Sequence, residues 1–162
     1  MTMIKETVDF IGIGAQKSGT SWLWSLLRAH PAIWMPPKKE LHYFDRSLKY
    51  SSSAKYLASE HFFRRMVSQQ PHNQAFRKKF ASSLLQAYEA RNWSTLQWTL
   101  RYYCRTYNDR WYVSLFKEGK GLVKGEITPS YSLLDTEDVQ HIKQLFPNLK
   151  IILLLRNPID RA

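Results

Sequence analysis

The chain has 162 residues, enough for one domain with a buried core and too few for two. Lysine and arginine number 24 against 13 aspartate and glutamate, and the formal charge of +11 indicates an anionic ligand such as a nucleotide, nucleic acid, anionic glycan or membrane surface. The single cysteine, Cys104, excludes an internal disulfide, and no Cys/His cluster suggests zinc. Residues 1–9 lack the apolar core of a signal peptide, and no run approaches the roughly 18 apolar residues of a membrane span. These features predict a cytoplasmic protein without a membrane span.

The first third of the chain is organised around residues 10–22, FIGIGAQKSGTSW. Apolar residues at 8, 10, 11 and 13 predict a buried strand, interrupted by Gly12 and Gly14 where the backbone turns or approaches a ligand. Apolar residues at 22, 23, 26 and 27 recur at helical spacing, so a helix begins near Gly19 or Thr20 and ends before Pro31. The free N–H groups at that helix start and the Lys17 ammonium favour a bound anion.

Two common phosphate motifs do not fit this loop. A Walker A loop requires Gly-Lys-Ser/Thr after its fourth variable residue, but Thr20 directly follows Gly19 and the lysine, Lys17, lies earlier. The dinucleotide fingerprint requires a third glycine three places after Gly14, and that place is Lys17.

Residues 36–45, PPKKELHYFD, form a loop that carries Lys38, Lys39, Glu40 and His42. The two prolines exclude a central strand. Taken alone, these charged residues belong to an ordinary surface.

Residues 54–118 are predicted to be mostly helical, with many aromatic and basic residues. Two apolar stripes predict core packing: Phe76, Phe80, Leu84 and Tyr88, and then Leu96, Leu100, Tyr103 and Tyr107. Arginines and lysines interleaved with tryptophan and tyrosine suit single-stranded nucleic acid or sugars. No RNP, KH or zinc-finger signature is present, so we do not expect nucleic acid as a partner.

The last third predicts strand, helix and strand. Residues 122–127 form the first strand, and Asp135 caps a helix whose core face holds Val139, Ile142 and Leu145 or Phe146. Residues 150–155, KIILLL, give the strongest buried-strand signal. Two strands separated by one helix indicate a right-handed crossover in a parallel sheet. Arg156 follows the second strand, at the edge of the sheet where ligands bind.

Four ordered segments together resemble the sulfotransferases that use 3′-phosphoadenosine 5′-phosphosulfate (PAPS), in their heparan-sulfate-type and bacterial branch. The segments are Gln16–Trp22, which resembles the 5′-phosphosulfate loop, then Lys39–Asp45, Gly125–Tyr131 and Leu155–Ala162. The resemblance implies an α/β, P-loop-like, three-layer fold with a central parallel sheet flanked by helices. It also implies that the chain is a single truncated domain, because the family's motif and further helices continue beyond Ala162.

The resemblance assigns roles to individual residues. The nucleotide-binding residues would be Gln16, Lys17, Ser18, Gly19, Thr20, Ser21, Trp22 and Arg156. Lys17 would also stabilise the leaving group, Glu40 would be the base with His42 as the alternative, and Arg156 would contact the 3′-phosphate. Trp22 either contacts adenine or belongs to the core. The product would be 3′,5′-ADP, and no metal is required.

The resemblance implies that the acceptor is a hydroxyl or an amine, with carbohydrate as one candidate, and that the helical segment 54–118 would lie near it. Heparan-sulfate enzymes commonly carry lysine at the position of Ile127, which argues against a glycosaminoglycan acceptor. Two other functions stay open: an inactive, truncated module that binds anions or glycans, and a P-loop nucleotide kinase. The sequence names neither the acceptor nor the oligomeric state.

Overall fold

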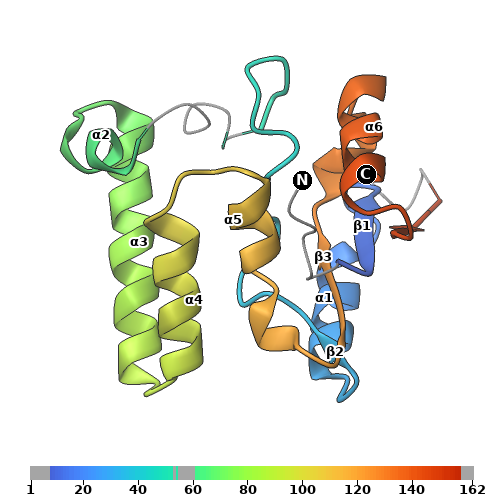
Figure 1. Ribbon diagram of the computed structural model, residues 1–162, viewed down its shortest axis with the longest axis horizontal. Coiled ribbons are helices and arrows are strands. Elements are labelled where there is room, and N and C mark those ends of the chain that lie inside the picture. The colour runs from blue at the N-terminus through green and yellow to red at the C-terminus, as the bar shows by residue number, and fades with distance from the viewer. Residues whose placement is uncertain (1–7, 53, 55–60, 158–162) are drawn as a thin grey trace.

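The computed structural model describes residues 8–52, 54 and 61–157 of the chain. Figure 1 shows a parallel sheet at one end of the molecule and a group of helices at the other. The elements in chain order are β1 Phe10–Gly14, α1 Thr20–Ala29, β2 Ile33–Trp34, α2 Phe62–Val67, α3 Pro71–Glu89, α4 Trp93–Tyr103, α5 Asp109–Ser114, the 3₁₀ helix η2 Lys117–Gly119, β3 Val123–Ile127, the 3₁₀ helix η3 Pro129–Leu133, α6 Thr136–Leu145 and β4 Lys150–Leu153.

The sheet has the order β2-β3-β1-β4, and each neighbouring pair is parallel. Phe10 of the central strand β1 lies opposite Gly125 of β3 and Lys150 of β4. The strands predicted at residues 8–13 and 122–127 are therefore confirmed as β1 and β3. The predicted parallel crossover through α6 is confirmed as well. Because all strands run the same way, the loops that follow β1 and β3 meet at one edge of the sheet.

Helices cover both faces of the sheet, so the molecule has three layers and the predicted fold class is confirmed. Phe10 and Ile11 are adjacent in β1 and point to opposite faces. On the Phe10 face, Leu23 and Leu27 of α1 pack against the sheet. On the Ile11 face, buried residues of α5 and α6 contribute to the larger core.

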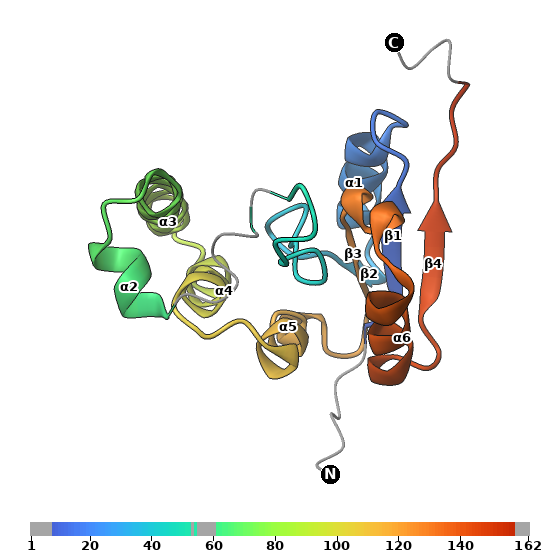
Figure 2. The ribbon, with the colours of Figure 1, turned by 90° about the horizontal axis from the view of Figure 1, so that it is seen from above.

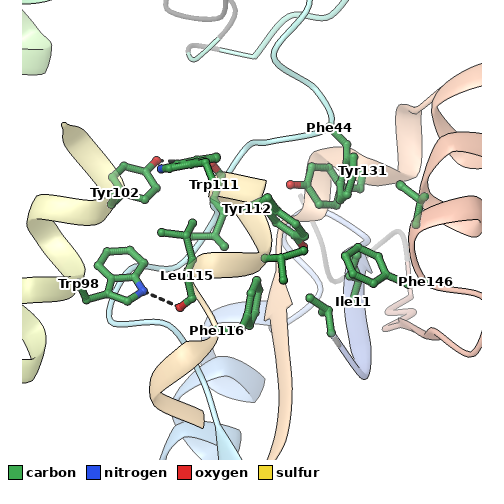
Figure 3. Packing of buried hydrophobic residues seen from close by; sticks show 14 of the residues in the cluster. Ile11, Phe44, Trp98, Tyr102, Trp111, Tyr112, Leu115, Phe116, Tyr131 and Phe146 are labelled. Atoms are coloured by element: carbon green, nitrogen blue, oxygen red, sulfur yellow. Dashed lines mark hydrogen bonds between the residues drawn. The ribbon is translucent and has the colours of Figure 1, made fainter. Parts of the chain in front are cut away.

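Aromatic packing joins the helical half of the molecule to the sheet (Figure 3). Trp98 of α4 donates a hydrogen bond from Nε1 to the Leu115 carbonyl at 2.9 Å and stacks on Tyr102 with ring centroids 5.1 Å apart. Tyr112 of α5 contacts Phe116 and Phe146, so its ring links the helices to α6. Large aromatic side chains bury much apolar surface at little conformational cost, which favours this mode of packing.

The predicted stripes on α3 and α4 are partly wrong. Tyr88 is 65% exposed and Leu100 is 43% exposed. Trp98 and Tyr102, four residues apart, are buried instead. The helix α4 packs against both α3 and the segment around α5. The contact with the α5 segment buries the face of α4 that carries Trp98 and Tyr102, and Leu100 does not lie on that face.

Two corrections concern α6 and β4. Asp135 caps α6 by accepting a hydrogen bond from the Asp138 N–H, as predicted, but Val139 is exposed while Ile142 and Phe146 are buried. The predicted buried strand is β4, which forms the edge of the sheet; Ile151 is 54% exposed. Among the described residues, β4 pairs on one side only, and an apolar run does not reveal which strand of a sheet lies at the edge.

Candidate active site

The loop after β1 turns with two glycines in conformations that suit glycine. Gly14 has φ 127° and Gly19 has φ 91°. Gly19 is the N-cap of α1, and no side chain caps that helix end. The first N–H groups of α1 therefore keep their hydrogen-bonding capacity, and the positive end of the helix dipole faces the edge of the sheet. The arrangement suits an oxyanion.

A pocket of about 430 Å³ lies at this helix end. It is lined by Gln16, Lys17, Gly19, Thr20, Ser21, Lys39, Glu40, His42, Pro129 and Ser130. We call it the donor pocket. It brings together five of the eight predicted nucleotide-binding residues and both candidate bases, although these come from segments more than 15 residues apart in the sequence.

The other three predicted residues lie outside the lining of this pocket. The hydroxyl and the N–H of Ser18 both donate to the Ala15 carbonyl. Trp22 is 68% exposed on α1, so the prediction that it could belong to the core is wrong. Arg156 is exposed beyond β4, two residues after Leu154, whose backbone pairs with Gly14 and Ala15.

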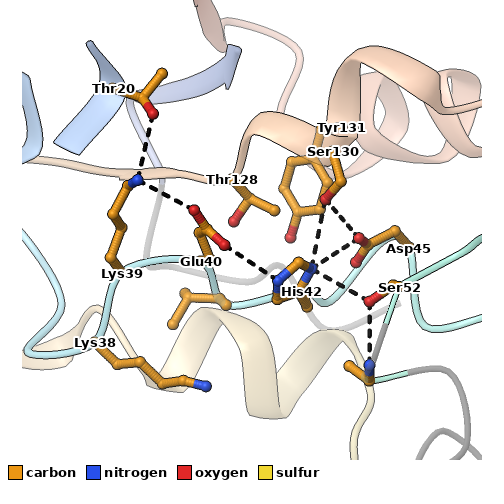
Figure 4. Close-up of polar contacts among 12 residues, drawn as sticks. Thr20, Lys38, Lys39, Glu40, His42, Asp45, Ser52, Thr128, Ser130 and Tyr131 are labelled. Carbon is orange, nitrogen blue, oxygen red and sulfur yellow. Dashed lines mark hydrogen bonds and ion pairs between the residues drawn. The ribbon is translucent and has the colours of Figure 1, made fainter. Parts of the chain in front are cut away.

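Lys39 lines the pocket, although the sequence analysis assigns it no role. Its ammonium donates to the Ser21 hydroxyl at 2.9 Å and to the Thr20 hydroxyl at 3.3 Å. It also pairs with Glu40 Oε1 at 3.1 Å (Figure 4). Lys39 thus joins the start of α1 to the candidate base. Its position directly before Glu40 was the available signal, but sequence alone does not tell which of two adjacent lysines faces the pocket.

His42 is held between two carboxylates. Its Nδ1 lies 2.8 Å from Asp45 Oδ2, and its Nε2 lies 3.5 Å from Glu40 Oε2. Asp45 is buried and also accepts a hydrogen bond from the Ser130 hydroxyl at 2.7 Å. Burial alone would raise the pKa of Asp45, but the hydrogen bonds from His42 and Ser130 hold it below its ordinary value. An ionised Asp45 accepts a hydrogen bond from the Nδ1–H group. Nε2 is then the nitrogen that can exchange a proton on the Glu40 side.

A buried carboxylate, Glu126, anchors the loop that carries these residues. It accepts hydrogen bonds from the Tyr112 hydroxyl at 2.6 Å, from the Thr128 hydroxyl at 2.7 Å and from the Leu41 N–H at 3.3 Å. Burial raises the pKa of Glu126. The Glu40 N–H also donates to the Ile127 carbonyl at 3.2 Å, so the loop is fixed to the end of β3.

Strained backbone is concentrated at the donor pocket. Lys17, Glu40 and His42 have φ values of 56°, 61° and 52°, in the left-handed region that side chains other than glycine rarely adopt. Such residues cost on the order of 1–3 kcal/mol each and persist where the surrounding contacts enforce them. The pocket therefore has the features of a functional site.

The comparisons with known proteins decide the family. The family model described as "Sulfotransferase family" matches residues 9–162. The chain belongs to the sulfotransferase family. A search of curated proteins gives no match. The crystal structure of a sulfotransferase from Alicyclobacillus acidocaldarius is similar, with a TM-score of 0.51 and 25% sequence identity. The alignment covers 94% of this chain and 46% of that protein, so the chain spans about half the length of this relative.

A second cavity of this sulfotransferase-family chain adjoins the first. It has a volume of about 310 Å³ and lies between the loop and the helices α3 and α4. Figure 2 shows the loop around residues 36–52 between these helices and the sheet. His42 lines both cavities, so it stands at their junction. We call this second space the junction cavity.

The described part of the chain has neither a metal-binding cluster nor a membrane-spanning helix. Residues 8–52, 54 and 61–157 contain no group of three or more histidine, cysteine, aspartate or glutamate side chains arranged to hold a metal ion. None of the helices described here is both long and apolar enough to cross a bilayer.

Proposed function

We propose that this chain, or the longer protein whose fold it shares, transfers a sulfuryl group from PAPS to an acceptor hydroxyl or amine. One observation carries the proposal. The uncapped start of α1, Lys17 and Lys39 line the same pocket as Glu40 and His42. An anionic donor and a proton acceptor would thus meet across a single space, as group transfer requires.

The residues of the donor pocket fit the 5′-phosphosulfate of PAPS. The N–H groups at the start of α1 and the hydroxyls of Thr20 and Ser21 would hold its oxygens. Lys39 already contacts both hydroxyls, and Lys17 lines the same wall. The two ammonium groups would stabilise charge that develops on the leaving oxygen. PAPS supplies the transferable sulfuryl group and leaves as 3′,5′-ADP.

Glu40 is proposed to accept the proton of the acceptor. The new bond joins the acceptor oxygen or nitrogen to sulfur, the bond from sulfur to the leaving oxygen breaks, and the acceptor proton passes to the carboxylate. The Glu40 side chain is 38% exposed and lines the donor pocket. His42 is oriented by Asp45, and its Nε2 lies 3.5 Å from Glu40 Oε2. His42 is the alternative acceptor of the same proton.

Arg156 is proposed to contact the 3′-phosphate. It follows the strand that pairs with β1, at the same edge of the sheet as the donor loop. A guanidinium group binds phosphate through charge-assisted hydrogen bonds, which would distinguish PAPS from nucleotides that lack the 3′-phosphate.

Calorimetric titration of the chain tests the donor site without knowledge of the acceptor. We expect 3′,5′-ADP to bind without magnesium and more tightly than ADP or ATP. The variant Lys39→Met should weaken this binding, while Lys78→Met, which changes an exposed lysine of α3, should leave it unchanged. A preference for ATP that requires magnesium would favour a nucleotide kinase. A folded chain that binds inorganic sulfate but no nucleotide would be an anion-binding module.

A further inference from the structure

Among the described residues that line it, the junction cavity has three positive charges and no carboxylate. The cations are Lys38 from the loop, Arg46 from the loop and Lys79 from α3. The rest of the lining consists of small, aromatic and imidazole side chains: His42, Ala54, His72, Ala75, Phe76, Tyr102, Tyr103 and Tyr107. A cavity with this lining attracts anions.

Arg46 is buried and Lys38 is half-buried, and neither pairs with a carboxylate of the described chain. Lys38 Nζ and Arg46 Nη2 each donate to the Tyr102 hydroxyl at 3.1 Å, so the two charges converge on one neutral oxygen. Arg46 is only 7% exposed, and its Nε and Nη1 have no hydrogen-bond acceptor among the residues that the structure describes. Buried charges in proteins are normally paired, so this convergence leaves room for an anion to supply the missing partner.

Burial does not neutralise these groups. Desolvation alone would lower the pKa of Lys38, but Tyr102 and Tyr103 hold it above its ordinary value. Burial alone would raise the pKa of Tyr102, but the charges of Lys38 and Arg46 hold it below its ordinary value. The cations therefore persist at neutral pH and polarise the hydroxyl between them.

The aromatic rings of the cavity brace the cations rather than offering free stacking surfaces. Tyr102 stacks on Trp98 and has the Lys38 ammonium 4.8 Å from its ring centroid. The Arg46 guanidinium lies 4.0 Å from the centroid of Tyr107. Cation–π contacts of this kind hold a charge in place. Recognition in this cavity thus rests on charge more than on ring stacking.

The adjacent lysines 38 and 39 divide between the two spaces. Lys39 reaches the start of α1 in the donor pocket, and Lys38 points away from Thr20 and Glu40 (Figure 4). Lys38 instead donates a hydrogen bond to Tyr102 in the junction cavity. His42 borders both. A molecule in the junction cavity would therefore meet the donor pocket at His42.

We propose that the junction cavity is the acceptor site and selects small acceptors that carry a carboxylate or sulfate near the hydroxyl or amine to be sulfated. This inference rests on the proposed function. The cavity volume of about 310 Å³ is near the lower end of ligand pockets, which run from about 300 to 1,000 Å³. That size suits a single ring with its substituents.

Binding of two matched pairs of probes tests the proposal: glucuronate against glucose, and 4-hydroxybenzoate against 4-hydroxybenzamide. Titrations followed by calorimetry or by amide NMR shifts are run with and without saturating 3′,5′-ADP. We expect each anion to bind about tenfold more tightly than its neutral partner, with 3′,5′-ADP leaving that affinity unreduced. The result should not depend on whether the ring is a sugar or a phenol.

Variants of α3 supply a matched control. Lys79→Met removes a cation that lines the cavity, and should weaken binding of the anions about threefold to tenfold with the neutral probes unaffected. Lys78→Met removes the neighbouring exposed lysine, which does not line the cavity, and should change neither. If the Arg46→Met variant folds, it should weaken binding of the anions more than Lys79→Met does. If it does not fold, the Lys79→Met variant alone tests the proposal.

The outcomes separate the two proposals. Any one of four results would overturn the acceptor site. They are equal affinity for both members of each pair, no binding of any probe up to about 10 mM, displacement of the anions by 3′,5′-ADP, and equal effects of the two lysine variants. Anion binding that follows Lys79 in a chain that does not bind 3′,5′-ADP would leave the cavity's selectivity intact and refute the PAPS-dependent function.

Discussion

The Asp45→Asn variant tests the contacts that orient His42. Asp45 Oδ2 accepts hydrogen bonds from His42 Nδ1 at 2.8 Å and from the Ser130 hydroxyl at 2.7 Å, and its other oxygen, Oδ1, has no partner among the described residues. An asparagine can keep an oxygen toward His42 only by placing its amide group where Oδ1 now lies, without an acceptor. The alternative orientation turns the amide group toward Nδ1 and forces the other imidazole tautomer.

Both orientations lose a charge-assisted hydrogen bond, which is worth roughly 1.5–3 kcal/mol. We therefore expect the free energy of unfolding to fall by about 2 kcal/mol at pH 7, or about 30-fold in the unfolding equilibrium. With a denaturant slope of about 2 kcal/mol/M, the midpoint of urea unfolding moves down by about 1 M.

The pH dependence follows from the lowered pKa of Asp45. Its folded-state pKa lies below the ordinary 3.8, so the stabilisation is present above that pH and is lost as the pH falls through the folded-state pKa. The difference between Asp45→Asn and the unmodified chain should therefore shrink below about pH 4.

The control is Asp135→Asn, an exposed N-cap at which asparagine caps equally well. It also gives up an exposed ion pair with Lys49, which solvent screens, so its loss changes the stability little. The assay is urea unfolding followed by tryptophan fluorescence from pH 3 to 7. A loss below about 0.5 kcal/mol at pH 7, or a loss that does not change between pH 7 and pH 3, would refute the pairing of Asp45 with His42.

Three further variants test the donor pocket. Lys39→Met should weaken 3′,5′-ADP binding about tenfold in a titration, because an ammonium at the start of α1 is lost; unchanged affinity would remove Lys39 from the site. Glu40→Gln should abolish sulfuryl transfer while 3′,5′-ADP still binds, since an amide accepts no proton; if His42→Ala has that effect and Glu40→Gln does not, His42 is the base. Arg156→Ala should erase the discrimination between 3′,5′-ADP and 5′-AMP, and intact discrimination would place the 3′-phosphate elsewhere.

The local elements of this fold follow from the sequence because their signals are local. Apolar runs bounded by glycine predict β1 and β3, and Pro31 ends the first helix where expected. The Asp135 cap is likewise a matter of residues close together in the chain. The loop after β1 could be placed for the same reason, because its lysine, glycine and hydroxyl residues occupy one short segment.

The arrangement of the site depends on contacts between distant segments. Sequence could place Lys38 and Lys39 in one loop, but the hydrogen bond to Tyr102, 64 residues away, is what turns Lys38 to the junction cavity. Asp45 finds its second partner in Ser130, which lies 85 residues later. The exposed position of β4 is also a property of the whole sheet, since an apolar strand has the same sequence at an edge as in the centre.

The sequence by itself therefore determined β1, α1, β3, α6 and β4, the position of the loop after β1 and the resemblance to sulfotransferases, because each depends on residues that are near neighbours in the chain. Only the tertiary structure decided which cation serves which cavity, how His42 is held between Glu40 and Asp45, and which apolar stripes are buried. These features arise when β1, β3 and the helices pack together, and packing joins residues that the linear sequence keeps apart.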